Sequence, residues 1–108
     1  MFPILILLAL EIPDDTKRIA QKIRMGDAKA FKFFFDVHNK QLYRFLIQRR
    51  MREEVAQDLV QQAFIWIWEH RTEIDPEKSL KAYLFKIGYT RMLNQIRDNQ
   101  KNTSLDVY

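Results

Sequence analysis

The chain has 108 residues, of which 47% are hydrophobic and 13% aromatic, and this suffices for one compact domain with its own core. The absence of Cys excludes a disulfide framework and a thiolate metal site, and we expect a cytoplasmic location. With only two Gly and three Pro the composition favours an all-α fold, a bundle of about four helices, and a net charge of +4 is compatible with a polyanionic partner.

The first thirteen residues are expected to form an apolar N-terminal arm. The apolar run from Phe2 to Leu10 is far shorter than the roughly 20 residues that a membrane-spanning helix needs. It also lacks the preceding basic region and the cleavage site of a secretory signal. We therefore expect no membrane insertion and an arm that packs on the domain or on a neighbouring copy. A targeting or membrane role is the alternative.

Two helices are predicted next. Asp14 and Asp15 can start a helix that runs to about Arg24, Gly26 can end it in a left-handed conformation, and Asp27 can cap the following helix. In that second helix, large side chains recur at spacings of three and four and predict the core face: Phe31, Phe34, Phe35, His38, Leu42, Phe45 and Leu46. The opposite side is basic, with Lys29, Lys32, Lys40 and Arg44.

A third helix is predicted to begin at Glu53 and Glu54, because acidic side chains stabilise the positive end of the helix dipole. One broad arc of this helix is apolar and should be buried: Ala56, Leu59, Val60, Ala63, Phe64 and Ile67. The reverse arc is polar apart from one aliphatic side chain, and consists of Asp58, Gln61, Gln62, Ile65 and Glu69. A stripe of this kind suits a protein partner.

A loop and a last helix complete the predicted domain. The pair Asp75-Pro76 indicates a loop from His70 to Lys78. Ser79 is the expected N-cap of the last helix, whose first half should turn four residues inward: Leu80, Tyr83, Leu84 and Ile87. After Asp98 the sequence is polar and is expected to fray. The predicted domain therefore covers residues 14–101, and residues 102–108 form a polar tail or the start of a linker.

The sequence carries no recognisable catalytic or metal-binding motif. His38 and His70 lie on different predicted elements, and no HExxH, EF-hand, P-loop or GxSxG pattern occurs. We interpret His38 as a hydrogen-bonded core histidine. We expect no metal, no cofactor and no enzymatic activity.

A basic and aromatic strip remains as the candidate for chemistry. It is made of Lys78, Lys81, Tyr83, Lys86, Tyr89, Arg91 and Asn94, and no acidic residue occurs between Lys78 and Arg97. These residue types can neutralise phosphates, stack on unpaired bases and hydrogen-bond base edges. The alternative is that Tyr83 belongs to the core and the lysines form a solvated face.

One segment resembles a family signature. The run from Asp58 to Trp68, DLVQQAFIWIW, is similar to the Asp-Leu-Val-Gln-x-x-Phe-x-x-x-Trp pattern of extracytoplasmic-function (ECF) sigma factors, in their region 2. Three further blocks resemble the same family in the same order: Gly26-Asp27-x-x-Ala30-Phe31, Leu42-Tyr43-Arg44-Phe45, and the run from Ser79 to Ile87. The resemblance extends from about Lys17 to Lys101.

This resemblance implies two binding surfaces and a role in transcription initiation. One surface would bind the clamp helices of the largest subunit of core RNA polymerase through Asp58, Gln61, Gln62 and Ile65, with Phe64 and Trp68 as buried supports. The other would hold the single-stranded non-template minus-ten element and help to melt the promoter, through Arg71, Lys78, Ser79, Lys81, Lys86, Tyr89 and Asn94. An anti-sigma factor is a further implied partner. In the family a second helical domain usually follows and reads the minus-thirty-five element.

Two other functions compete with this hypothesis. A helical protein-interaction module would bind a regulator through the stripe around Ile65 and would leave its basic faces solvated. An ordinary helix-turn-helix regulator would instead bind double-stranded operators tightly without polymerase.

Overall fold

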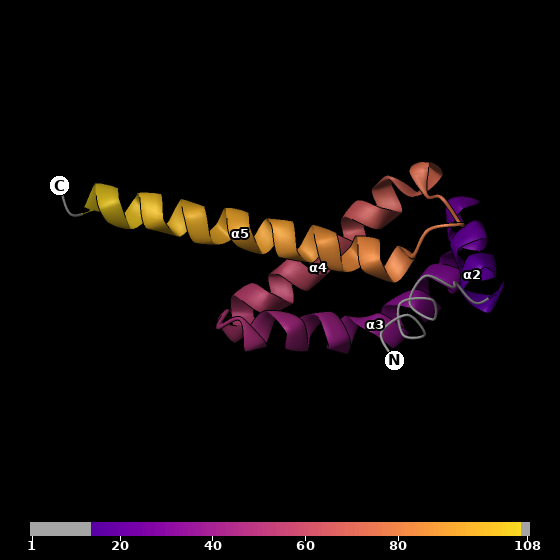
Figure 1. Cartoon of the computed structure of the whole chain (residues 1–108), viewed down its shortest axis with the longest axis horizontal. Helices are drawn as coiled ribbons and strands as arrows, with labels where there is room; N and C mark the ends of the chain where they lie inside the picture. Colours follow the sequence, from indigo (N-terminus) through magenta and orange to yellow (C-terminus); the bar gives the residue numbers. More distant parts are fainter. Residues whose placement is uncertain (1–13, 107–108) are drawn as a thin grey trace, which may run out of the picture.

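The structure is a computed structural model that describes the backbone of residues 14–106 and the side chains of residues 14–100. Its elements are α2 (Asp14–Arg24), α3 (Ala28–Gln48), α4 (Glu53–Glu69), the short 3-10 helix η1 (Arg71–Glu73) and α5 (Leu80–Asp106). No strand occurs within residues 14–106, and the predicted all-α bundle is confirmed. In Figure 1, α4 crosses between α3 and α5, and α2 lies at the end of α3 opposite the α3–α4 turn. The predicted arm at residues 1–13 lies outside the described residues.

The turn between α2 and α3 forms as the sequence predicted. Gly26 has a φ of 89°, in the left-handed region that favours glycine, and its backbone N–H donates to the carbonyl of Ile23. The N–H of Asp27 donates to the carbonyl of Lys22, which completes a Schellman C-cap. Asp27 then caps α3, because its carboxylate accepts from the backbone N–H groups of Lys29 and Ala30.

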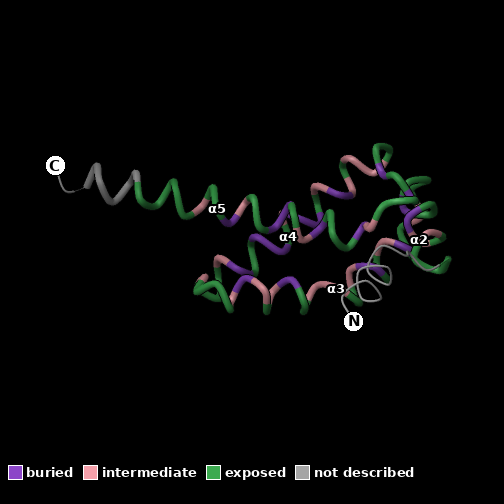
Figure 2. Tube along the Cα trace, viewed as in Figure 1, coloured by how far each residue is buried: buried purple, intermediate pink, exposed green. Residues whose placement is uncertain are grey.

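The core lies where α4 packs on α3. All six residues predicted to be buried on α4 are buried. Phe64 is the centre of an aromatic cluster, with ring centroids 4.8 Å from Phe35, 5.7 Å from Phe34 and 6.3 Å from Phe31. On α3 only Phe34, Leu42 and Leu46 of the predicted core face are buried, and the other members are half-buried. Figure 2 shows the buried positions concentrated in α3, α4 and the first half of α5.

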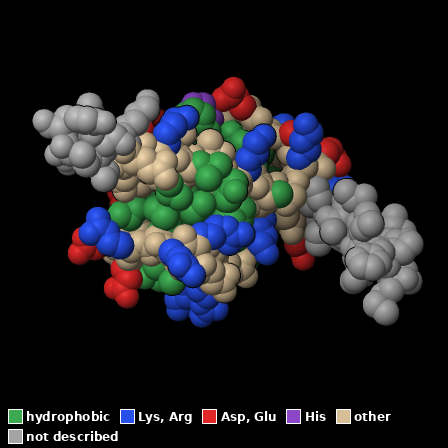
Figure 3. Space-filling view, turned by 60° about the vertical axis from the view of Figure 1, so that its left-hand side comes forward, with side chains coloured by type: hydrophobic (Ala, Val, Ile, Leu, Met, Phe, Trp, Pro, Cys, Tyr) green, Lys and Arg blue, Asp and Glu red, His purple; other side chains and the backbone are tan. Residues whose placement is uncertain are grey.

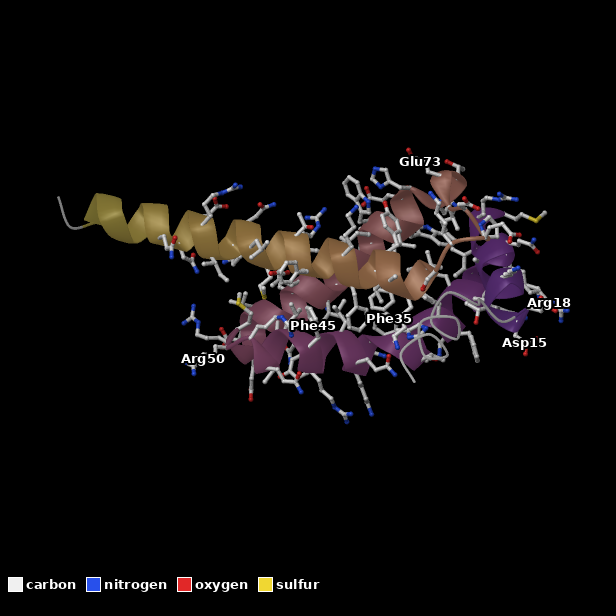
Figure 4. All side chains as sticks on the ribbon, in the orientation of Figure 1. Asp15, Arg18, Phe35, Phe45, Arg50 and Glu73 are labelled. Atoms are coloured by element: carbon white, nitrogen blue, oxygen red, sulfur yellow. The ribbon has the colours of Figure 1, made fainter. Side chains whose placement is uncertain are left out.

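The first half of α5 packs closely on α3. Ser79 caps this helix as predicted, since its hydroxyl accepts from the N–H of Ala82 at 3.1 Å. Leu80, Leu84 and Ile87 are buried. A Cβ on the buried Gly88 would lie 2.9 Å from Cδ1 of Leu42, so glycine allows the two helices to approach. Figure 4 shows Phe35 and Phe45 pointing from α3 toward α4 and α5.

Two predictions about α5 were wrong. Tyr83 was expected inward but is 40% exposed, because it turns to the α4 side, where its hydroxyl accepts from Nε1 of Trp66 at 3.1 Å. The helix was expected to fray after Asp98 but continues to Asp106. Residues 99–106 contain neither Gly nor Pro, the two residues that disfavour a helix most strongly. The second half of α5 extends beyond the rest of the bundle (Figure 1).

Candidate functional site

The four residues predicted to bind a protein partner form one row along α4, here called the outer row: Asp58, Gln61, Gln62 and Ile65. Asp58, Gln61 and Ile65 are exposed, and Ile65 has 53% of its surface accessible. Phe64 behind them is fully packed, whereas Trp68 is only half-buried. The row thus presents a carboxylate, an amide and one aliphatic side chain on a rigid helix, and exposed aliphatic side chains in polar surroundings suit protein contacts.

Gln62 differs from the rest of the outer row, because it connects α4 to α5. Its Nε2 donates to Oδ2 of Asp58 at 2.6 Å, and its Oε1 accepts from Nη1 of Arg91 at 3.1 Å. Gln61 lies on the other flank, where it lines a groove between α3 and α4 together with Lys40 and Tyr43. The outer row is therefore flanked by α3 on one side and by α5 on the other.

The loop before α5 and the start of that helix enclose an open groove of about 510 Å³, here called the loop groove. It is lined by Glu73, Ile74, Asp75, Lys78, Ser79, Leu80, Ala82, Tyr83 and Lys86. Lys78 and Lys86 are exposed and can contact phosphates, while the carboxylates of Glu73 and Asp75 can accept hydrogen bonds from base amino groups. One oxygen of Asp75 already accepts from the N–H of Glu77 at 3.0 Å.

The structure does not bring all the predicted DNA-binding residues together. Lys78, Ser79 and Lys86 meet in the loop groove. Lys81 instead lies on the side of α5 that faces α3, with Nζ 5.9 Å from the Phe85 ring centroid, and Tyr89 packs against Phe45 at 6.1 Å. Asn94 lies farther along α5, and its Oδ1 accepts from Arg97 at 3.0 Å.

Arg71 is placed apart from the loop groove. Its Nη1 donates to the carbonyl of Trp68 at 2.9 Å, and its guanidinium stands 4.4 Å from the Trp68 ring centroid. A Cβ on Gly26 would lie 3.7 Å from its Nε. These contacts attach η1 to α4 and to the end of α2. A DNA contact by Arg71 stays a prediction.

Sequence reasoning missed one aromatic residue, Trp66. Its ring stacks on His70 with centroids 3.7 Å apart, and the Arg91 guanidinium lies 5.4 Å from its centroid. Trp66 lines a slot of about 270 Å³ with Tyr83, Lys86, Ile87, Thr90 and Arg91, here called the aromatic slot. Its position four residues after Gln62 was the available signal, because residues four apart on a helix are neighbours on its surface. Figure 3 shows a face on which hydrophobic side chains gather between Lys and Arg side chains.

One histidine of α3, His38, has a shifted pKa. Burial lowers the pKa of His38 from its ordinary value of 6.5, a hydrogen bond to Gln41 acts in the opposite direction, and the charge of Lys81 lowers the pKa further. The ring lies edge-on to Phe34 at 4.8 Å. His38 is only half-buried, so it lies at the edge of the core and not within it as predicted.

Within the described residues no group of three or more His, Asp and Glu side chains could hold a metal ion. None of the described helices combines the length and the apolar character needed to cross a membrane. Lys17 forms an ion pair with Glu77 at 3.1 Å, an exposed contact of α2 with the loop that contributes little stability.

Comparison with known proteins identifies the family. The sequence-family model of sigma-70 region 2 matches residues 34–102, which include α4, the loop groove and most of α5. The chain belongs to the sigma-70 region 2 family. The resemblance to ECF sigma factors in the sequence is thereby confirmed. Sigma factors are initiation factors and not enzymes, in agreement with the expected lack of enzymatic activity.

Three curated relatives are similar to this region 2 domain. The chain is 31% identical over 87 residues to the RNA polymerase sigma factor CnrH of Cupriavidus metallidurans, 26% over 90 residues to the ECF RNA polymerase sigma factor SigW of Bacillus subtilis, and 29% over 86 residues to the RNA polymerase sigma factor NccH of Alcaligenes xylosoxydans xylosoxydans. These matches cover 80%, 83% and 80% of the chain but only 44%, 48% and 44% of the relatives. The chain therefore spans less than half the length of each relative. No solved structure matches it.

Proposed function

We propose that this region 2 domain binds core RNA polymerase through the outer row of α4 and engages the single-stranded minus-ten element through the loop groove, in the initiation of transcription in the cytoplasm. The observation that carries the proposal is the presence of two chemically different surfaces on one core. The outer row combines one carboxylate with amides and one aliphatic side chain, whereas the loop groove has two lysines beside two carboxylates.

The polymerase contact rests on the rigidity and composition of the outer row. Ile65 is 53% exposed on a helix whose opposite side is completely buried, so its outward position is fixed by the packing of Ala63, Phe64 and Ile67. Asp58 adds a charge that can select a basic partner surface. The clamp helices of the largest polymerase subunit are the proposed partner, and an anti-sigma factor would compete for the same surface.

The DNA contact rests on the loop groove. Unpaired bases need a cavity with hydrogen-bonding groups, and the backbone needs cations beside that cavity. The loop groove offers both, because Ser79, Glu73 and Asp75 line it and Lys78 and Lys86 border it. Capture of a base there would favour the open form of the promoter over the duplex.

The polymerase contact is tested by replacing Ile65. Ile65→Asp should abolish co-purification with core polymerase, because an unpaired charge would be buried at the centre of the interface. Val37→Asp is the matched control, since Val37 is an aliphatic residue on α3 that is 44% exposed. Circular dichroism would establish that both variants fold. Equal polymerase binding by Ile65→Asp and the parent chain would refute the docking assignment. The outer row would then be explained by the alternative, a protein-interaction module that binds a regulator.

The DNA contact is tested by reversing the two lysines of the loop groove. The double variant Lys78→Glu with Lys86→Glu should lose binding to a single-stranded minus-ten oligonucleotide, and the slope of log affinity against log salt should fall by about 0.7 for each phosphate contact removed. The double variant Lys29→Glu with Lys40→Glu changes the net charge equally on exposed positions of α3 and serves as the control. If both double variants weaken binding equally, the contact is diffuse and the loop groove is not the site. Stronger binding to duplex than to single strands would favour the helix-turn-helix alternative.

A further inference from the structure

The α3–α4 turn and the second half of α5 enclose a third open groove, of about 680 Å³, here called the turn groove. Its floor is apolar and consists of Met51 and Val55, which are half-buried against the core, and Ile96, which is 37% exposed. Two arginines of the turn line one side, and amide side chains of α5 line the other. The turn groove therefore combines an apolar floor with polar and cationic walls.

Arg50, one of the two arginines, occupies a backbone position that favours glycine. Its φ is 67°, in the left-handed region, and its N–H donates to the carbonyl of Ile47 at 2.9 Å. The N–H of Met51 donates to the carbonyl of Leu46 at 3.3 Å, so α3 ends in the same Schellman C-cap as α2. Gly26 fills the equivalent position of α2, whereas the Cβ of an arginine is strained there. Figure 4 shows Arg50 extending outward from the turn.

Arg52, the other arginine, also stands at a position that disfavours it. It is the N-cap residue of α4, where Ser, Thr, Asp or Asn would satisfy a backbone N–H, and its side chain makes no capping hydrogen bond. Its charge also lies at the positive end of the helix dipole. Both arginines are exposed, and neither forms an ion pair with a carboxylate of residues 14–100. Because neither side chain suits its local position, we expect both to serve a contact with another molecule.

The chemistry of the turn groove selects the class of partner. A guanidinium group binds a carboxylate through two parallel hydrogen bonds, and none of the described residues that line this groove is acidic. A phosphate backbone would leave the apolar floor in water, whereas a protein segment can cover it with aliphatic side chains. No strand occurs within residues 14–106, so a partner cannot bind there by adding a strand to a sheet edge. An amphipathic helix lying in the groove is the binding mode that fits.

We propose that the turn groove binds an acidic amphipathic helix of a protein partner. Aliphatic side chains at spacings of three and four pack on the apolar floor, and carboxylates beside them pair with Arg50 and Arg52. The turn groove shares no residue with the outer row or the loop groove, so this contact is independent of the proposed function and goes beyond it.

The probe for this contact is a synthetic helical peptide of about 18 residues, made of Leu, Glu and Ala, with Leu along one face and Glu beside it. Titrated into the isotope-labelled chain, it should shift the backbone amide resonances of residues 50–55 and 96–100. A peptide of the same composition in scrambled order should not. The double variant Arg50→Gly with Arg52→Ser should weaken binding by about 5-fold for each carboxylate contact removed.

Stability provides a second measurement that separates binding from folding. The same double variant should unfold at a higher denaturant concentration than the parent chain, because glycine suits the left-handed position and serine can cap α4. Lower affinity in a more stable chain cannot come from loss of structure. Lys29→Gln with Arg44→Gln removes the same charge from exposed positions of α3 and should leave the affinity almost unchanged.

Three results would overturn the proposal. The scrambled peptide could bind as well as the amphipathic one, or the two double variants could lose affinity equally, and either result would mean diffuse charge attraction. Amide shifts in the turn groove could instead arise with a single-stranded oligonucleotide and not with the peptide. The groove would then contact nucleic acid and not a protein helix.

Discussion

The outer row of α4 and the basic strip of α5 are organised in different ways. The outer row occupies one face of a helix whose opposite face is buried throughout, so its members share a single surface. The residues of the basic strip divide among the loop groove, the side of α5 that faces α3 and the exposed second half of α5. The helical period alone therefore places the residues of the outer row on one surface. The positions of the basic-strip residues depend instead on which neighbouring helix each turn of α5 packs against.

The largest effect is expected from a substitution that removes the core packing beneath the outer row. Phe64→Ala should lower the free energy of unfolding by about 3–5 kcal/mol, because it empties the centre of the cluster with Phe31, Phe34 and Phe35. The same substitution at Phe33, which is 57% exposed, should change stability by less than about 0.5 kcal/mol. Denaturant unfolding followed by circular dichroism measures both. Similar losses for the two variants would contradict the core described for α3 and α4.

The next effect concerns the attachment of the basic strip. Gly88→Val should destabilise the chain by about 1–3 kcal/mol, because the added carbons meet the buried Leu42 where α5 approaches α3. Leu93→Val, at an exposed position of the same helix outside the loop groove, is the control. Binding to polymerase should suffer less than binding to single-stranded DNA, since α4 remains packed on α3. Equal losses of the two activities would mean that the two surfaces are not independently supported.

A smaller effect is expected at the hydrogen bond that connects α4 to α5. Gln62 and Arg91 should show a coupling free energy of about 0.5–1.5 kcal/mol in a double-mutant cycle of alanine variants, because the half-buried hydrogen bond between them joins α4 to α5. The cycle can be read from unfolding free energies. A coupling indistinguishable from zero would show that the hydrogen bond does not join the regions energetically, and Gln62 would then be available to a partner.

The smallest effect is a pH dependence. The pKa of His38 is lowered in the folded state, so the unfolded chain takes up its proton first as the pH falls. The contribution to stability is complete above the unfolded value of 6.5 and is lost as the pH falls through 6.5 toward the lowered pKa, with no further change below it. His38→Gln should flatten this part of the stability profile, and Lys81→Ala should reduce it. An unchanged profile in Lys81→Ala would contradict the placement of Lys81 beside His38.

Local sequence predicted most of the fold for physical reasons that act over a few residues. Gly26 and Asp27 fixed the α2–α3 turn, because a left-handed C-cap and a carboxylate N-cap need only their own neighbours. The buried face of α4 followed from its period alone. The prediction that α5 frays after Asp98 was wrong for a local reason too. It relied on the polarity of the segment, and polarity by itself does not stop a helix when Gly and Pro are absent.

By itself, the sequence determined the helical class, the register of α4 and the capping residues, because each depends on short-range backbone geometry and on the contrast between apolar and polar side chains. Only the tertiary structure decided that Tyr83 turns to Trp66, that Arg91 joins Gln62, and that Arg71 and Lys81 lie away from the loop groove. These placements arise where side chains from different helices meet, and the crossing of α4, α5 and the loop sets them. No period along a single segment contains that information.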